Sequence, residues 1–254
     1  MRKKLLIAAA ILSAAAIIAW LFIPKKTEPV AVVEEKPVVV AKPLLTGLFV
    51  EHIFNVKEKK DGYKNTVNIY KKDNLYFFKS VITKKGQKDI TAEAKLNKDF
   101  ETIEWKCNNP KKNIQVSALR KGNKIILTGT FDKKENNKKE INIDARKWQQ
   151  VYQLGLMKFA VKEPVGKSIE FWSLNPDEPQ NAMVLAAVKE SRELIDLHGK
   201  KVGAARLKIC LAGFLSVFWT GDYWFRLSDG FFVRGKISGD IFVELQEEKL
   251  IKRK

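Results

Sequence analysis

Apolar and polar residues alternate one by one along much of the chain after residue 60. Ile90, Ala92, Ala94 and Leu96, for example, alternate with polar or charged neighbours. A period of two puts successive side chains on opposite faces of a β-strand, so each such run predicts a strand with one solvated face. The runs cover residues 63–71, 89–96, 102–108, 112–120, 123–131 and 139–144. Short strands at this spacing predict a mainly β fold, a curled antiparallel sheet that forms a half-barrel or an open barrel.

One segment has helical spacing instead. Residues 146–160 place Trp148, Val151, Leu154 and Phe159 at intervals of three to five residues, which predicts a helix.

Residues 177–198 allow two interpretations. They fit a helix that is capped by Asp177 and ended by Gly199. They also fit a long strand that starts over residues 182–188, bends near Ser191 and continues to Leu197. We favour the strand, because alternation resumes on both sides of the segment.

The C-terminal part predicts a β-hairpin around Ser228-Asp229-Gly230. A three-residue loop with Gly230 as the bulge residue keeps the apolar face coherent. This register pairs Leu227 with Phe231 and Phe225 with Val233. The opposite face then carries Trp224 across from Arg234 and Arg226 across from Phe232, pairs that are suited to cation–π stacking.

The N-terminal part predicts a membrane anchor. Residues 5–23 are apolar apart from Ser13, follow three basic residues, and span roughly 28 Å as a helix, close to the thickness of a bilayer core. Ala14-Ala15-Ala16 offers a cleavage pattern, but the apolar run continues past it to an interfacial Trp20, so we favour an uncleaved single transmembrane helix. The predicted organisation is an anchor over 1–23, a Pro-, Val-, Lys- and Glu-rich linker over 24–45, and a β-rich domain over 46–254. The basic start favours a cytoplasmic N-terminus. We therefore expect a single-pass protein of the bacterial inner membrane, with the domain in the periplasm or outside the cell.

The formal net charge of +18 changes this picture little. The basic residues are mostly lysines gathered at expected turns, such as Lys84 to Lys88 and Lys133 to Lys139. Lysines at strand ends serve solubility and discourage edge pairing, whereas a nucleic-acid site needs a contiguous basic stripe. We therefore expect no nucleic-acid partner, and an anionic lipid surface is the better match for the excess charge.

Residues with reactive side chains are few and scattered. His52 falls on an apolar face and is expected to be a hydrogen-bonded core residue, while His198 is expected in a turn. Cys107 lies on an apolar face with Ile103 and Trp105, so we expect a buried thiol that is not bonded to Cys210. No hydrolase, zinc-protease or phosphate-loop motif is present. The sequence therefore predicts no catalytic residues, no metal site and no cofactor.

Glu193, Gly199, the run from Val202 to Leu207 and the run from Tyr223 to Arg234 resemble the exported bacterial proteins of domain-of-unknown-function family 3108. The resemblance covers residues 190–235. It implies an exported, sheet-rich fold similar to the curled sheets of lipoprotein carriers, and it supplies no activity or catalytic residue.

The function that we expect is non-enzymatic. Export, a curled sheet and the C-terminal aromatics indicate a membrane-tethered envelope protein that binds an apolar or amphiphilic component, such as a lipid, in its concave sheet. The candidate ligand face is Trp224, Arg226, Phe232 and Arg234. One alternative is a scaffold of an envelope assembly, and a further one is a hydrolase of an envelope polymer, which would need two carboxylates across a cleft.

Overall fold

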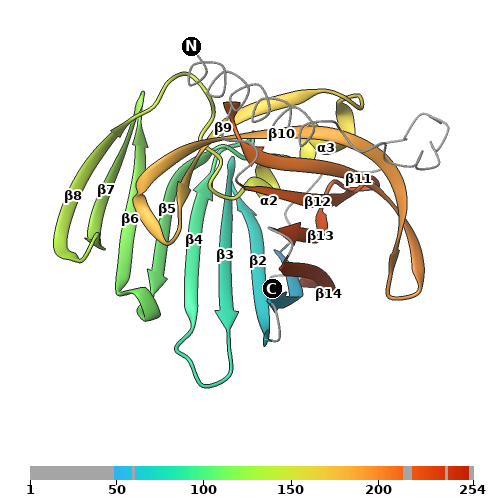
Figure 1. The fold of residues 1–254 in the computed structure, drawn as a ribbon, viewed down its shortest axis with the longest axis horizontal. Helices are drawn as coiled ribbons and strands as arrows, with labels where there is room; N and C mark the ends of the chain where they lie inside the picture. Colours follow the sequence, from blue (N-terminus) through green and yellow to red (C-terminus); the bar gives the residue numbers. More distant parts are fainter. Residues whose placement is uncertain (1–48, 59–60, 214–218, 238–239, 252–254) are drawn as a thin grey trace, which may run out of the picture. The chain divides into compact units, whose positions relative to one another are not determined.

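A computed structural model describes residues 49–58, 61–213, 219–237 and 240–251 (Figure 1). The chain divides into two units, Met1–Val32 and Val33–Lys254, and everything below concerns the second. The predicted anchor over 1–23 and the whole predicted linker over 24–45 lie outside the described residues. Within the described residues, no helix has both the length and the apolar character needed to cross a membrane.

The described residues form fourteen strands. The first eight are β1 Phe49–Glu58, β2 Asp61–Lys72, β3 Leu75–Thr83, β4 Ile90–Leu96, β5 Thr102–Asn109, β6 Ile114–Lys121, β7 Lys124–Phe131 and β8 Lys134–Asn142, with a 3₁₀ turn η1 Pro110–Lys112 between β5 and β6. The last six are β9 Ser168–Asn175, β10 Glu178–Leu197, β11 Lys200–Leu211, β12 Thr220–Arg226, β13 Phe232–Ile237 and β14 Ile241–Ile251. Burial alternates along them as the sequence predicts: Val50, His52, Phe54 and Val56 of β1 are all buried.

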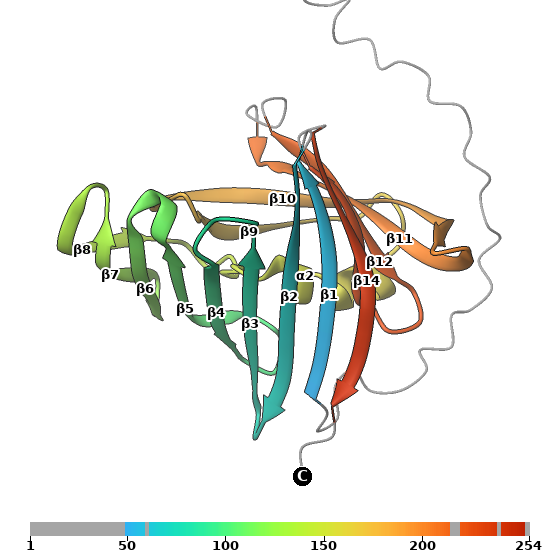
Figure 2. The ribbon, with the colours of Figure 1, turned by 90° about the horizontal axis from the view of Figure 1, so that it is seen from below.

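The strands form one antiparallel sheet of two meanders. Strands β1 to β8 pair in sequence order, strands β9 to β14 do the same, and β1 pairs with β14. The order therefore runs β8-β7-β6-β5-β4-β3-β2-β1-β14-β13-β12-β11-β10-β9. Figure 2 shows β1 and β14 side by side, with β9 and β10 crossing the other strands. The rings of Phe54 on β1 and Phe232 on β13 lie 5.6 Å apart on what we call the inner face, the face that carries the buried side chains. The predicted mainly β fold with a curled antiparallel sheet is confirmed.

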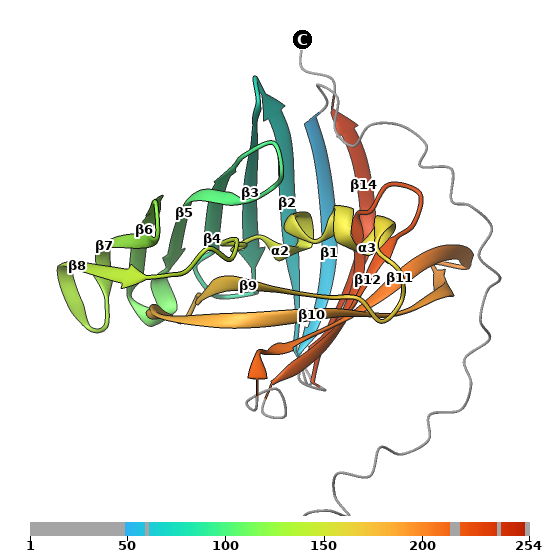
Figure 3. The same cartoon turned by 90° about the horizontal axis from the view of Figure 1, so that it is seen from above.

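The predicted helix over 146–160 is partly wrong. The helical residues are α2 Tyr152–Gly155 and α3 Met157–Lys162, which lie close together in Figure 3. Trp148 instead forms a parallel bridge with Trp172 of β9. Its ring is fully buried, which explains why an extended residue shares the apolar spacing of the helix that follows.

Residues 177–198 form a strand, as we favoured. The twenty residues of β10 include an irregularity between Lys189 and Ser191, where the pairing with β11 shifts by one residue. This is the place where the sequence predicts the bend. A bulge of this kind lets a long strand follow a strongly curled sheet.

The predicted register of the C-terminal hairpin is only partly confirmed. Trp224 pairs with Arg234 as predicted, but a bulge at Val233 makes Phe225 face Phe232. The backbone N–H of Arg226 then donates to the carbonyl of Phe231 at 2.8 Å, so neither the Phe225–Val233 pair nor the Arg226–Phe232 pair forms. The bulge turns Phe232 onto the inner face, where its ring lies 5.9 Å from the rings of both Tyr223 and Phe225.

Candidate binding site

The inner face lines an apolar cavity of about 320 Å³. Strands from both meanders and the segment around α2 contribute to its wall, which is possible only because the sheet curls. Most of the lining side chains are aliphatic or aromatic. They are Phe54, Val56, Val67, Ile69, Phe78, Ile82, Ile90, Ala92, Trp105, Val151, Leu154, Pro176, Phe231, Phe232, Ile237, Ile241 and Val243.

The polar part of the lining is uncharged apart from one histidine. It consists of His52, Tyr63, Asn65, Ser80, Cys107, Gln150, Gln153 and Tyr223. Among the described residues that line the cavity, none is lysine, arginine, aspartate or glutamate. In a chain with 47 basic and 29 acidic residues, such a wall selects against charged groups.

The two ends of the inner face differ. Ile82 pairs with Ile90 beside the β3–β4 turn, Ile237 pairs with Ile241 beside the β13–β14 turn, and all four side chains are half-buried. Both turns lie at the same end of the antiparallel sheet. At the other end the core is solid: the rings of Tyr76 and Phe100 lie 4.4 Å apart and both residues are buried. The cavity is therefore nearer to solvent at the end that carries these two turns.

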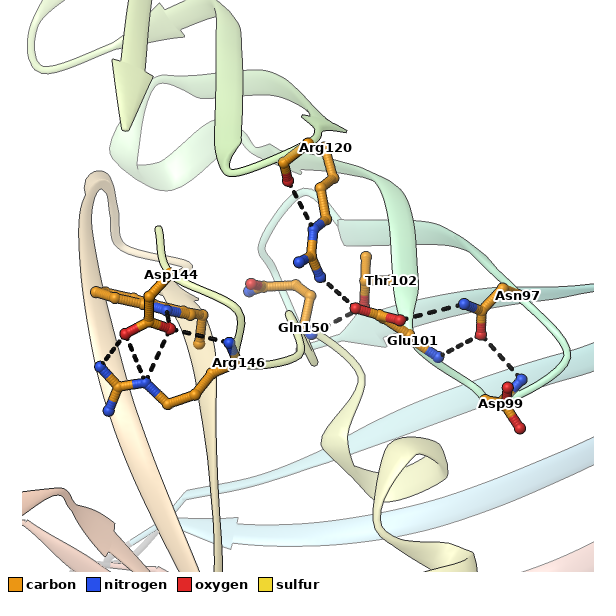
Figure 4. Close-up of polar contacts among 10 residues, drawn as sticks. Asn97, Asp99, Glu101, Thr102, Arg120, Asp144, Arg146 and Gln150 are labelled. Atoms are coloured by element: carbon orange, nitrogen blue, oxygen red, sulfur yellow. Dashed lines mark hydrogen bonds and ion pairs between the residues drawn. The ribbon is translucent and has the colours of Figure 1, made fainter. Parts of the chain in front are cut away.

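An extended segment before α2 connects β5 to β9 across the inner face (Figure 4). The backbone N–H of Thr102 donates to the carbonyl of Trp148 at 2.9 Å, and the hydroxyl of Thr102 accepts from the backbone N–H of Gln150 at 2.9 Å. The amide of Gln150 then holds both the N–H and the carbonyl of Leu174 on β9, at 2.8 and 2.9 Å. These bonds satisfy the backbone N–H and carbonyl groups of Leu174 on the edge strand β9. They also fix the position of the Gln150 side chain in the cavity wall.

A bulge in β5 makes this connection possible. The pairing of β4 with β5 shifts between Lys95 and Leu96, so that Thr102, and not Ile103, is the buried residue beside Leu96. The expectation that Ile103 shares the buried face of Trp105 and Cys107 is therefore wrong, while Trp105 and Cys107 are buried as predicted.

A series of polar contacts starts at His52. Its Nε2 lies 3.1 Å from Oε2 of Glu248, although the approach is not aligned as a hydrogen bond. The same carboxylate oxygen accepts from Arg226 at 2.8 Å, and Arg226 also binds Asp229 at 2.5 Å. The imidazole of His52, together with the guanidinium of Arg226, lowers the pKa of Glu248 to about 2. His52 is 2% exposed, as the sequence predicts for a core histidine, and it contributes one edge of the cavity.

The four predicted ligand-face residues do not share a face. Trp224 and Arg234 lie on the outer face, where Trp224 donates to Glu193 and Arg234 binds Glu244 at 2.6 Å. Arg226 is held by Asp229 and by Glu248. The cation–π contact of Arg234 is with Phe242, at 5.8 Å, and not with Trp224. Of the four, Phe232 alone lines the cavity, because of the bulge at Val233.

A second hollow of about 490 Å³ lies on the outer face of β4 to β8 and is mainly polar. Among its described lining residues the one carboxylate is Glu93, which pairs with Lys79 at 3.0 Å. A glycosidase-like site needs a second carboxylate facing the first across the cleft. This hollow therefore gives no support to the hydrolase alternative.

Both cysteines are free thiols. Cys107 is 5% exposed, and burial raises the pKa of its thiol to about 11. Cys210 is half-buried on the outer face of β11, as its place in the sequence beside Lys208 predicts. Among the described residues, no group of three or more His, Cys, Asp or Glu side chains is arranged to hold a metal ion.

Comparison with known proteins bears on the fold alone. No protein-family model matches the chain, and no curated protein matches it. Among solved structures, the chain is similar to a crystal structure described as a β-barrel-like protein of domain of unknown function DUF1849 from Brucella abortus. The TM-score is 0.57 at 9% sequence identity, over 83% of this chain and 100% of that chain. The curled, sheet-rich architecture is thus shared with a protein of very different sequence, and the resemblance to family 3108 stays a prediction.

Proposed function

We propose that this protein binds an apolar or amphiphilic molecule in the cavity of its curled sheet and carries out no chemistry on it. The observation that carries the proposal is the cavity itself. Its volume of about 320 Å³ lies at the lower end of the range of about 300–1,000 Å³ typical of small-molecule sites. Its wall is mainly aliphatic and aromatic, which favours an apolar occupant by the hydrophobic effect.

The proposal includes the setting that the sequence predicts. The anchor over residues 5–23 tethers the protein to the bacterial inner membrane, and the domain lies in the periplasm or outside the cell. A binding domain held beside a bilayer is close to a source of apolar molecules. The ligand is accordingly a component of the envelope, with a chain long enough to fill the cavity.

Native mass spectrometry of the detergent-extracted, full-length protein tests the proposal. We expect a small apolar molecule to be retained. Ala92→Phe, which adds a ring inside the cavity, should reduce the bound fraction strongly. Thr91→Phe is the matched control, because Thr91 is the neighbouring residue on β4 and lines the outer hollow. Equal retention by both variants, or an empty wild-type protein in the presence of added apolar ligand, would refute a binding role for the cavity.

A further inference from the structure

The polar groups in the cavity wall indicate the chemistry of the ligand's head group. Ser80 donates a hydrogen bond to Oδ1 of Asn65 at 2.7 Å. Ser80 is 7% exposed and Asn65 is half-buried, and both line the cavity. In this arrangement Ser80 occupies the amide oxygen of Asn65, and the amide nitrogen is the end left to a partner. Among the described residues, no oxygen accepts from this nitrogen.

Two further amides line the cavity, Gln150 and Gln153, and the one on Gln150 is already used. Gln150 binds the backbone of Leu174 with both ends of its amide and also accepts from the indole of Trp148 at 3.1 Å. Its role is to hold β9, so it has little left to offer a ligand. Asn65 is thus a donor that is oriented by a neighbour and presented to an apolar space.

Apart from His52, whose Nε2 already lies 3.1 Å from the carboxylate of Glu248, the wall offers no group to neutralise a charged head. The ammonium of Lys84 lies 5.9 Å from the ring centre of Tyr63, one of the lining residues, but Asp61 holds it at 2.9 Å. A carboxylate or an ammonium placed in the cavity would lose its hydration without gaining an opposite charge, which is costly. An ester or amide carbonyl would lose far less and could accept from Asn65.

We infer that the ligand class is an uncharged single-chain acyl ester or amide, with its carbonyl oxygen bound by the Asn65 amide that Ser80 orients. The size agrees: 320 Å³ is room for roughly ten groups of the volume of a water molecule, hence one medium-length chain. This inference rests on the proposed function and adds the chemical class and the residue that selects it.

The test compares matched ligands on the full-length protein by native mass spectrometry, which identifies each bound molecule by its mass. Methyl decanoate, decanoate, decylammonium and decane share one chain length and differ in the head. We expect the ester to bind about tenfold or more tightly than either ion. It should also bind roughly three- to tenfold more tightly than decane, the usual range for one hydrogen bond.

Asn65→Leu should remove the preference for the ester over decane while decane still binds. Asn68→Leu is the matched control, because Asn68 lies on the same strand with its side chain on the outer face, and it should leave the preference unchanged. Ser80→Ala keeps the Asn65 amide but frees its orientation, so it should weaken the preference in part. Thermal unfolding of each variant verifies that the sheet is intact.

The outcomes separate the two proposals. If the wild-type protein binds neither decane nor the ester, the proposed function fails and this inference fails with it. If both bind but decanoate binds as tightly as the ester, or Asn65→Leu keeps the ester preference, this inference alone is overturned.

Discussion

Glu248 on β14 and His52 on β1 lie directly opposite each other, with 3.1 Å between the imidazole and carboxylate atoms. The folded-state pKa of Glu248, about 2, is below its ordinary value of 4.5. A carboxyl whose pKa is lowered by folding stabilises the fold when ionised. Its contribution is complete above about pH 4.5 and is lost as the pH falls toward 2.

We therefore expect Glu248→Gln to lower the urea midpoint at neutral pH, and the difference from wild type to shrink as the pH falls through this window. Glu247→Gln is the control, since Glu247 forms a solvent-exposed pair with Lys249 and should change the midpoint little. If the difference in urea midpoint between the wild-type protein and Glu248→Gln stays constant down to pH 2, the coupling of Glu248 to His52 and Arg226 is contradicted.

Gly230 is required by both its backbone and its surroundings. Its φ is +78°, and a Cβ there would lie 3.1 Å from the carbonyl oxygen of Met157 and 3.2 Å from Cγ2 of Val161 on α3. Gly230→Val should cost about 1–3 kcal/mol from the backbone alone. Asn tolerates this φ better, but its Cβ meets the same atoms, so Gly230→Asn should also lower the melting temperature. Ser228→Asn, in the same loop at an exposed position, should have little effect and serves as the control. If Gly230→Asn has the melting temperature of the wild-type protein, α3 must move aside to make room for the Asn side chain.

The two thiols should differ in reactivity. Cys107 is buried and its pKa is about 11, so at neutral pH it carries almost no thiolate and should react very slowly. Cys210 is half-buried and should react slowly in the native protein. One thiol should therefore titrate before unfolding and two after it. Cys210→Ala should abolish the native reaction and Cys107→Ala should not; the reverse result would mean that the inner face is open at β5.

Alanine substitutions of Trp224 and Phe232 should distinguish the roles of the two faces of the hairpin. Phe232 is 6% exposed, lines the cavity and contacts three aromatic rings, so Phe232→Ala should cost about 3–5 kcal/mol and reduce ligand retention. Trp224 is half-buried on the outer face, so Trp224→Ala should cost less and leave retention unchanged. Loss of ligand in Trp224→Ala at unchanged stability would restore the ligand face that the sequence predicts.

Local alternation predicts much of this fold. The period of two located β2 and β4 to β7, placed His52 and Cys107 on the inner face, and favoured the strand interpretation of residues 177–198. These features follow from the sequence because side-chain direction along a strand is a local property. The same reasoning fails at bulges, where one extra residue reverses the faces. Ile103 on β5 and Phe232 on β13 are both such cases.

The tertiary structure decided the rest. Trp148 has helical spacing from Val151, but it lies in an extended segment because Thr102 and Trp172 supply its partners from distant strands. The cavity likewise depends on how far the sheet curls, which brings β2 and β3 opposite β12 and β13. Pairing partners and curvature are set by contacts between residues far apart in the chain. The donor that Ser80 orients on Asn65, fifteen residues away, becomes a candidate binding group only once those contacts exist.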